Sequence, residues 1–279
     1  MKLPYRLLAM DLDGTALGAD PAQFAPDVLE AAQEAAARGV TVVFATGRPL
    51  SVLPPVIREG SLPWLRYLVL NDGAQIWDRQ EKRWLWQQTL RAAVLDGVEQ
   101  VSEHYRIPVE FIDGAGGYHV RLGWHAQLMQ DTGVTAFHRN LLQTRLQPLE
   151  APAASLAPAG IVRINMPRVP ADCWDAVCAG LEAAGALPME CCAGALEITS
   201  ARAGKRQAVE FLAGQLGLSL ADVMALGDSG NDLALLQSAG WGVAMGNASD
   251  AVKRAANAVT DTNRESGAAK AVRRWLLDA

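Results

Sequence analysis

Apolar and polar residues alternate along the first part of the chain in the pattern of strands and helices taken in turn. Residues 7–10 form a short apolar run, and residues 40–45 are continuously apolar and β-branched, as expected of a strand covered on both faces. Residues 26–38 begin with proline, are rich in Ala and Glu and are followed by glycine, which predicts a helix. Another helix is expected to open at Pro49, and residues 66–70 predict a third strand.

The same order of elements returns near the C-terminal end. Buried strands are predicted at 223–226 and 242–245, and helices at 205–216, 232–239 and 268–277. Alternation of this kind implies right-handed crossovers and a parallel sheet. The sequence therefore predicts an α/β fold in which both ends of the chain build one doubly wound parallel sheet.

The middle of the chain has a different pattern. A hairpin is predicted where the Gly/Ala stretch 114–117 separates strand-like residues 109–112 and 118–122. Further elements are an exposed loop, a strand and a helix, predicted at 147–160, 161–166 and 171–184. We therefore expect residues 1–87 and 198–279 to form the core, with residues 88–197 as an inserted α+β domain.

Composition and charge narrow the classes of partner. The net charge is -5 and the sequence pI about 5.4, whereas nucleic-acid-binding proteins usually carry a basic stripe. The chain has no apolar run of the roughly 18 residues that a membrane span requires, and its short apolar start runs directly into Asp11 and Asp13, unlike a signal peptide. We expect a cytoplasmic protein that binds neither nucleic acid nor membranes; its oligomeric state is not indicated.

Polar motifs follow three strands of the predicted sheet: DLDGT at 11–15, TGR at 46–48 and GDSGND at 227–232. In open parallel sheets ligands bind beyond the carboxyl ends of the strands, so four carboxylates are expected at one edge. Such a cluster requires a positive charge, and oxygen ligands without His or thiolate suit Mg²⁺. Thr46 and Gly47 also precede a predicted helix start, which is a favourable position for binding an anion.

With these motifs the chain resembles the haloacid dehalogenase superfamily, in particular its Cof-type branch of sugar-phosphate phosphatases with a large inserted cap. DLDGT is similar to the first signature, ATGR at 45–48 to the second, and GDSGND to the fourth, while Lys205 stands where the third is expected. NDGA at 71–74 and GVAMGNA at 242–248 also resemble stretches typical of that branch. The resemblance covers both ends of the chain and hardly touches the insert, which it implies to be a substrate-specificity cap.

The resemblance implies a Mg²⁺-dependent phosphohydrolase that cleaves phosphate monoesters of small metabolites, sugar phosphates in particular. Asp11 would be the nucleophile that becomes an aspartyl-phosphate, and Asp13 the general acid and base. Mg²⁺ would be bound by Asp11, the carbonyl of Asp13 and Asp228, and Asp232 would fix the metal waters or the lysine. The phosphate-binding residues would be Leu12, Thr46, Gly47, Lys205 and Asn231.

The positive residues have alternative interpretations. A lysine at a helix start is usually a solvated surface charge, and only the family context favours a phosphate-binding role for Lys205. It is followed by Arg206 where Cof-type proteins usually carry glycine, a side chain that would displace the helix start or add a second charge near the site. Arg48 precedes a proline and is held extended, so it would contact either substrate or solvent.

Candidate substrate contacts in the insert come from sheet-face patterns. His119 and Arg121 alternate with apolar residues and would share one face, as would Arg163 and Asn165 on another strand. Either face would bind the leaving group or be solvated. A phosphomutase with the same aspartyl-phosphate also fits the sequence, because transfer or hydrolysis depends on how the cap excludes water. A non-catalytic phosphate-binding protein is disfavoured, since the carboxylates required for catalysis are all present.

Overall fold

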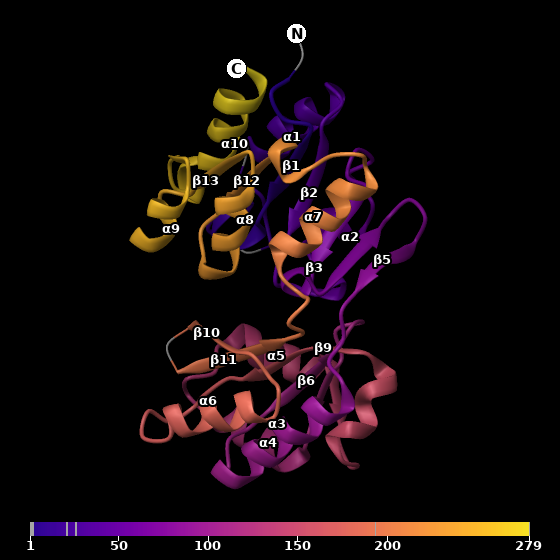
Figure 1. The fold of residues 1–279 in the computed structure, drawn as a ribbon, viewed down its shortest axis with the longest axis vertical. Coiled ribbons are helices and arrows are strands. Elements are labelled where there is room, and N and C mark those ends of the chain that lie inside the picture. The colour runs from indigo at the N-terminus through magenta and orange to yellow at the C-terminus, as the bar shows by residue number, and fades with distance from the viewer. Residues whose placement is uncertain (1–2, 21, 26, 193, 279) are drawn as a thin grey trace. The chain divides into compact units, whose positions relative to one another are not determined.

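The computed structural model describes residues 3–20, 22–25, 27–192 and 194–278. The chain folds as two compact units (Figure 1): the core, formed by Met1–Trp86 with Ala203–Ala279, and the insert, formed by Gln87–Arg202. The boundary predicted between residues 197 and 198 falls inside a strand of the insert, β11 (Ala195–Thr199). The chain leaves the insert after this strand and not within it.

The core is built on an eight-stranded sheet of order β14-β13-β12-β1-β2-β3-β4-β5. Its strands are β1 (Leu7–Met10), β2 (Thr41–Ala45), β3 (Tyr67–Leu70), β4 (Gln75–Asp78), β5 (Arg83–Gln87), β12 (Val223–Gly227), β13 (Trp241–Ala244) and β14 (Ala258–Val259). Neighbours from β14 to β3 pair in parallel, and β4 is antiparallel to β3. The chain starts at the central β1 and extends the sheet in both directions, which confirms the predicted doubly wound α/β fold.

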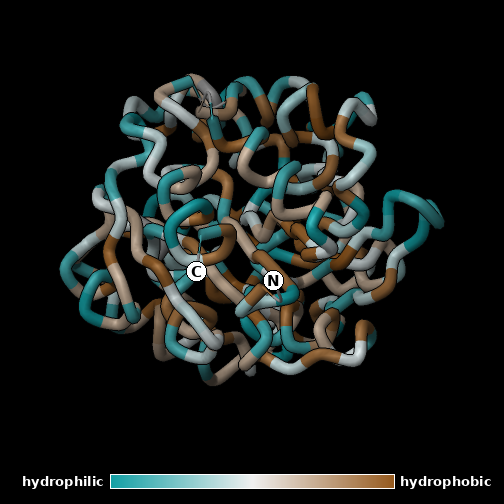
Figure 2. Tube along the Cα trace, turned by 90° about the horizontal axis from the view of Figure 1, so that it is seen from above, coloured by the Kyte–Doolittle hydropathy of each residue, from teal (hydrophilic) through white to brown (hydrophobic). Residues whose placement is uncertain are grey.

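Helices cover both faces of the core sheet. They are α1 (Val28–Ala37), α2 (Pro55–Arg58), α7 (Lys205–Gln215), α8 (Leu233–Ser238), α9 (Asp250–Ala255) and α10 (Gly267–Val272). Leu8 of β1 belongs to a hydrophobic cluster with α1 and α10, whereas the adjacent Leu7 belongs to a cluster with α7 and α8. Successive side chains of a strand point to opposite faces, so strands covered on both faces must be apolar throughout. Figure 2 shows hydrophobic segments inside the fold and hydrophilic residues concentrated in the connecting loops.

Prolines change one predicted element of the core. The helix expected to open at Pro49 is a 3-10 turn over Leu50–Val52, and α2 begins at Pro55. Pro54 and Pro55 have no N–H to donate, so a single helix cannot continue through them. Pro26, where another helix was expected to begin, lies outside the described residues.

The insert is an α+β unit, as predicted, with a six-stranded sheet of order β10-β11-β9-β6-β7-β8. Its other strands are β6 (Glu110–Asp113), β7 (Tyr118–Val120), β8 (Leu146–Pro148), β9 (Ile161–Met166) and β10 (Pro188–Cys192), and its helices are α3 (Ala92–Tyr105), α4 (Leu122–Gln130), α5 (Ala136–Arg145) and α6 (Trp174–Ala183). Neighbouring strands are antiparallel apart from β7 and β8, which are parallel.

The two faces of the insert sheet differ in character. On one face, Phe111, Ile164 and Leu196 belong to a hydrophobic cluster with α3 and α6, and we call this the apolar face. On the other, Glu110 and Glu197 both lie opposite Asn165 in the strand register, so the three form a row across β6, β9 and β11. We call this the polar face; Arg163, two residues before Asn165, lies on it too.

Two predictions for the insert differ from the structure. The strand predicted at 118–122 ends at Val120, and Arg121 is the residue that precedes α4. Arg121 therefore does not alternate with His119 along a strand. The exposed loop predicted at 147–160 contains the end of β8 and a 3-10 helix over Ala153–Ala159, in which Ala153 is buried.

Candidate active site

The carboxyl ends of β1 and β12 bring the first and last acidic motifs together. Asp11 directly follows β1, Asp228 directly follows β12, and the two strands are paired neighbours. One carboxylate oxygen from each of Asp11, Asp228 and Asp232 lies within 4.8 Å of the other two. The structure thus places three of the four predicted carboxylates in one cluster, using segments from both ends of the chain.

Lys205 is buried inside this cluster. It is the first residue of α7, only 2% exposed, and its Nζ donates to Asp11 Oδ1 at 2.6 Å and to Asp232 Oδ1 at 2.7 Å. Burial lowers the pKa of Lys205, but the carboxylates of Asp11, Asp232 and Asp72 outweigh it and raise that pKa above its usual value. Lys205 is therefore a charged, buried partner of the aspartates and not a solvated surface residue.

Asp232 uses both of its oxygens to organise its neighbours. Oδ1 accepts from Lys205, and Oδ2 accepts from the backbone N–H groups of Asp228 and Ser229 at 3.0 and 3.1 Å. A Cβ on Gly227 would lie 2.4 Å from Asp232 Cγ, so this packing requires glycine at that position. Asp232 is thus engaged by Lys205 and two backbone N–H groups, and the other two carboxylates of the cluster are those of Asp11 and Asp228.

The electrostatics of these two carboxylates fit a bound cation. Burial, followed by the charge of Asp232, raises the pKa of Asp228 to about 6. Burial also raises the pKa of Asp11, an effect that the ammonium of Lys205 opposes and Asp232 reinforces. Lys205 supplies a single positive charge to the three clustered carboxylates of Asp11, Asp228 and Asp232, and these offer oxygen ligands only. This is the ligand set that a hard cation such as Mg²⁺ prefers.

Asp13 is more exposed than Asp11 and is held by Arg48. The Asp13 side chain is 52% exposed, and both of its oxygens accept from the Arg48 guanidinium, with Nε at 2.7 Å from Oδ2. This pair links the first and second motifs, and within the second motif the backbone N–H of Arg48 donates to Thr46 Oγ1 at 3.1 Å. The structure thus places the Arg48 side chain against Asp13, with 12% of it exposed.

Special backbone conformations allow the loops to approach each other. Gly14 has φ +76°, and a Cβ there would lie 2.3 Å from Asp228 Oδ2. Asn71 and Asp72 have φ of +49° and +53°. Such backbone conformations are uncommon in residues other than glycine, and they are often found at functional sites. Asp72 Oδ1 accepts from Asn231 Nδ2 at 2.7 Å. Asp72, which belongs to the 71–74 stretch that resembles the Cof-type branch, therefore lies beside the fourth motif.

Asn247 was not among the predicted site residues. Its Nδ2 donates to the carbonyl of Gly14 at 2.9 Å and to Asp228 Oδ2 at 3.3 Å, so it joins the first and fourth motifs. The rule that located the aspartates, that polar residues beyond the carboxyl ends of parallel strands form the site, could also have identified Asn247. This residue follows the carboxyl end of β13, another strand of the same sheet. Arg206 does not enter the site, because its side chain pairs with Glu210 on α7 at 3.3 Å.

The candidate residues of the insert are divided between different environments. His119 lies opposite Phe111 in the strand register and pairs with Asp113 at 2.9 Å. Arg121 pairs with Glu99 of α3 at 2.6 Å. Arg163 instead lies on the polar face, with its Nη1 3.7 Å from Glu197 Oε1.

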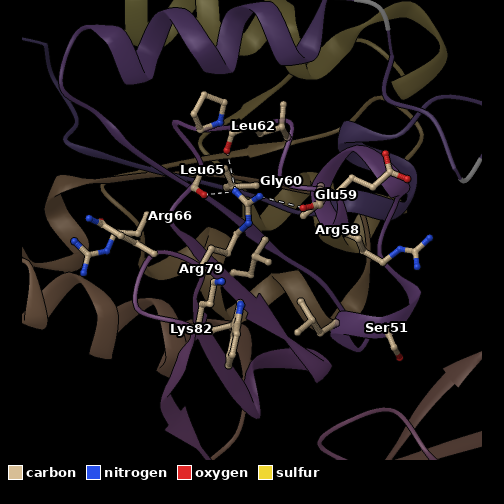
Figure 3. Close-up of a pocket in the computed structure, with 15 residues that line it drawn as sticks. Ser51, Arg58, Glu59, Gly60, Leu62, Leu65, Arg66, Arg79 and Lys82 are labelled. Carbon is tan, nitrogen blue, oxygen red and sulfur yellow. Dashed lines mark hydrogen bonds between the residues drawn. The ribbon is translucent and has the colours of Figure 1, made fainter.

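A cavity of about 800 Å³ lies elsewhere on the core, around α2 and β4 (Figure 3). The described residues that line it belong to none of the four motifs. Within it, the Arg79 guanidinium donates to the carbonyls of Leu62 at 2.9 Å and Ile57 at 3.1 Å, and also to that of Leu65. Arg79 therefore ties loops together, and this cavity lacks the groups for the predicted chemistry.

Comparisons with known proteins assign the chain to a family. The family model of haloacid dehalogenase-like hydrolases matches residues 8–150 and 190–272. A 5-amino-6-(5-phospho-D-ribitylamino)uracil phosphatase of Bacillus subtilis, YcsE, is 29% identical over 98% of this chain and 96% of its own. An HMP-PP phosphatase of Serratia proteamaculans is 27% identical over 88% of this chain and 85% of its own. The structure of a haloacid dehalogenase-like hydrolase from B. subtilis is 26% identical, covers 97% of this chain and 100% of its own, and gives a TM-score of 0.76.

The chain belongs to the haloacid dehalogenase-like hydrolases, because the family model spans most of it, including all four motifs. Within that family it is a Cof-type phosphatase, which confirms the resemblance carried by its motifs. Among the described residues, no helix combines the length and the apolar character required to cross a membrane.

Proposed function

We propose that this phosphatase hydrolyses phosphate monoesters of small metabolites, sugar phosphates among them, through an aspartyl-phosphate on Asp11. The observation that carries the proposal is the buried Asp11 carboxylate, held by Lys205 at 2.6 Å beside Asp228 at the carboxyl edge of the sheet. A carboxylate is already ionised at neutral pH and can attack phosphorus once nearby positive charge offsets its repulsion from the phosphate.

In the first step, a carboxylate oxygen of Asp11 bonds to phosphorus while the bond between phosphorus and the leaving oxygen breaks. Asp13 gives its proton to that oxygen. Lys205 compensates negative charge from its position between Asp11 and Asp232. The phosphoryl oxygens would contact Leu12, Thr46, Gly47 and Asn231 at the same edge of the sheet.

In the second step, water attacks phosphorus, Asp13 accepts a proton from it, and the bond to Asp11 breaks to release phosphate. The Arg48–Asp13 pair fixes the position of the Asp13 carboxylate and must loosen for Asp13 to protonate a leaving group. A phosphomutase would pass the phosphoryl group to a sugar hydroxyl at this stage, so measuring released phosphate against phosphorylated sugar separates the two reactions.

Asp11 and Asp228, together with the Asp13 carbonyl, would hold Mg²⁺. The bound ion supplies positive charge to the phosphoryl group and to the two carboxylates. Asp232 supports the site by orienting Lys205 and the backbone of Asp228.

Removing metal with EDTA should abolish turnover, and adding Mg²⁺ back should restore it. Mg²⁺ should also raise the melting temperature of the metal-free protein, because a ligand that binds only the folded state stabilises it, by about 2.7 kcal/mol at a hundred times Kd. Asp228→Asn should abolish both the restoration of turnover by Mg²⁺ and the rise in melting temperature, while leaving the fold intact. Full activity in metal-free protein, or the same thermal shift in the variant, would contradict this assignment.

Asp13→Ala should slow the two steps unequally. With p-nitrophenyl phosphate the leaving group needs little protonation, so the phosphoenzyme should still form, whereas its hydrolysis lacks a base and should be about 10²- to 10⁴-fold slower. Stopped-flow absorbance should record a burst of nitrophenolate followed by a slow steady rate. Loss of the burst along with the steady rate would exclude this role for Asp13.

The substrate is best sought by a phosphate-release screen with Mg²⁺ present. We propose that the insert, the expected cap of residues 88–197, selects the leaving group. Two relatives are named for 5-amino-6-(5-phospho-D-ribitylamino)uracil and for HMP-PP, so these compounds belong in the screen beside hexose and pentose phosphates. Release from no member of the panel would argue against the proposed substrate class.

A further inference from the structure

The cavity around α2 and β4 lies within the core alone and outside the four motifs (Figure 3). Its volume of about 800 Å³ is that of a site for a small organic molecule. Part of its wall is apolar and accessible, because Leu50 and Trp77 are half-buried and Pro63 is exposed. The cavity can therefore take a ligand that has an apolar ring or chain.

The charges around this cavity favour an anion. Four cationic side chains and one acidic side chain are found among the described lining residues: Arg58, Arg66, Arg79, Lys82 and Glu59. Arg66 is paired with Asp78 at 2.8 Å, whereas the other three cations form no ion pair within the described part of the chain. Figure 3 shows the Glu59 side chain directed away from Arg79. The cavity is thus positively charged in a protein whose net charge is -5.

Arg79 is the fixed positive group of the cavity. Its Nη1 and Nη2 donate to the carbonyls of Leu62 and Ile57 at 2.9 and 3.1 Å, and Nη1 donates to that of Leu65 as well. A guanidinium has five N–H donors, so the Nε–H and one N–H of Nη2 have no acceptor among the described residues.

These two N–H groups are suited to an oxyanion. Nε is not buried, and the side chain reaches across the middle of the cavity in Figure 3. Burial of other parts of the side chain lowers the pKa of Arg79, and no carboxylate of the described residues offsets that effect. An oxyanion in the cavity would accept from both N–H groups and supply the missing negative charge.

The cavity shares a segment of chain with the active site. Leu50 and Ser51 of the 3-10 turn line the cavity, and the carbonyl of the next residue, Val52, accepts from Arg48 Nη1 at 3.3 Å. The same guanidinium holds both carboxylate oxygens of Asp13. A ligand packed against the turn would restrict its movement and so keep Arg48 on Asp13.

We propose that this cavity is a regulatory site for a small organic anion, in which a carboxylate or phosphate group is attached to an apolar ring or chain. The oxyanion lies at Arg79 and Lys82, and the apolar part lies against Leu50 and Trp77. The bound anion slows the phosphatase, because Asp13 must separate from Arg48 before it can transfer a proton. The effect on the rate rests on the proposed phosphatase function, whereas the binding does not.

Titration calorimetry with the metal-free protein tests the binding. Phenylacetate carries a carboxylate, benzylphosphonate a phosphonate, and benzyl alcohol no charge. Phenylacetate should bind at one site per chain and the alcohol should not. Competition with benzylphosphonate for that site then shows whether a phosphate-like group or a carboxylate is preferred.

Two variants locate the site. Lys82→Glu places a negative charge at the cavity and should weaken the binding of phenylacetate by about tenfold or more. Arg254→Glu is the matched control, because Arg254 is an exposed residue of α9 outside the cavity and its replacement changes the net charge equally. Both replaced side chains are exposed, so both variants should fold.

Steady-state kinetics with p-nitrophenyl phosphate and Mg²⁺ test the regulation. Saturating phenylacetate should lower kcat of the wild-type protein by about fivefold or more, the usual size of coupling between two sites. Lys82→Glu should keep the basal rate and lose most of this inhibition at the same concentration. Arg48→Met should still bind phenylacetate but no longer be inhibited by it, since Asp13 is then not held.

The alternatives give different results. Equal weakening of binding by Lys82→Glu and Arg254→Glu, or equal binding of benzyl alcohol, would overturn the anion site. A rise in KM at constant kcat would mean that phenylacetate competes for the active site, and inhibition that persists in Arg48→Met would exclude the route through Asp13. If no phosphate ester is hydrolysed, the proposed function fails, and calorimetry with the two charge variants still decides about the cavity.

Discussion

Replacing Asp11 with asparagine should lower phosphate release by about 10³-fold or more for every substrate, the size of loss seen when a covalent nucleophile is removed. The amide has the shape of the carboxylate but neither its nucleophilicity nor its charge. Its oxygen can still accept from Lys205, which also keeps its contact with Asp232 at 2.7 Å. The fold should therefore persist, and a steady-state assay should report chemistry alone.

Stability measurements separate loss of chemistry from loss of fold. Burial raises the pKa of Asp11, so its ionised form opposes folding at neutral pH. Asp11→Asn removes that charge and should melt at a temperature no lower than the wild-type protein. Mass spectrometry of acid-quenched wild-type protein should detect one phosphoryl group on the peptide containing Asp11. Residual turnover above a few per cent, or a phosphoryl group on the variant, would place the nucleophile elsewhere.

The core could be predicted because its strands are short, apolar and covered on both faces. Strand β1 is apolar at every position, as a strand covered on both faces must be, and Asp11 follows it directly. This pattern predicts a buried strand that ends in a polar group. The rule that ligands bind at the carboxyl ends of parallel strands then located Asp11 and Asp228. Both predictions depend on backbone topology, which a local pattern can indicate.

Side-chain pairing could not be predicted in the same way. Arg48 contacts Asp13 because a long, flexible side chain adopts one of many rotamers, a choice that depends on residues distant in sequence. Asp72 enters the site through a left-handed backbone turn next to Gly73, where a Cβ would lie only 2.1 Å from the Gly204 carbonyl oxygen. Such close approaches belong to the tertiary structure.

The insert was harder to predict because its signals are weaker. Helix α3 begins after Arg91, which makes no capping hydrogen bond through its side chain, and it contains Gly97 in its interior. A residue without a capping side chain before the helix and a glycine inside it both lower the helix propensity of this segment, so the sequence does not predict a helix here. The structure explains Gly97, since a Cβ there would lie 2.4 Å from the Cβ of Ala184 near the end of α6. Close helix packing thus outweighs the local preference.

Replacing Lys205 with methionine should reduce both turnover and stability. Methionine fills a similar volume but leaves the buried carboxylates of Asp11 and Asp232 without their shared cation. Removing one partner of a buried ion pair costs about 3–5 kcal/mol, because a charge remains uncompensated. Turnover should fall by about 10²-fold or more, since a fixed positive charge next to the reacting phosphoryl group is lost.

The pH dependence of this loss identifies its cause. Without Lys205, the pKa of Asp11, already raised by burial, rises further, so the folded variant binds a proton that the unfolded chain releases. Stability should therefore increase as the pH falls through that raised value, and the deficit relative to wild type should shrink. Lys270→Met is the matched control, because Lys270 and Asp261 form an exposed pair that should contribute little at any pH. A deficit independent of pH would mean that Lys205 stabilises α7 by packing and not by neutralising the aspartates.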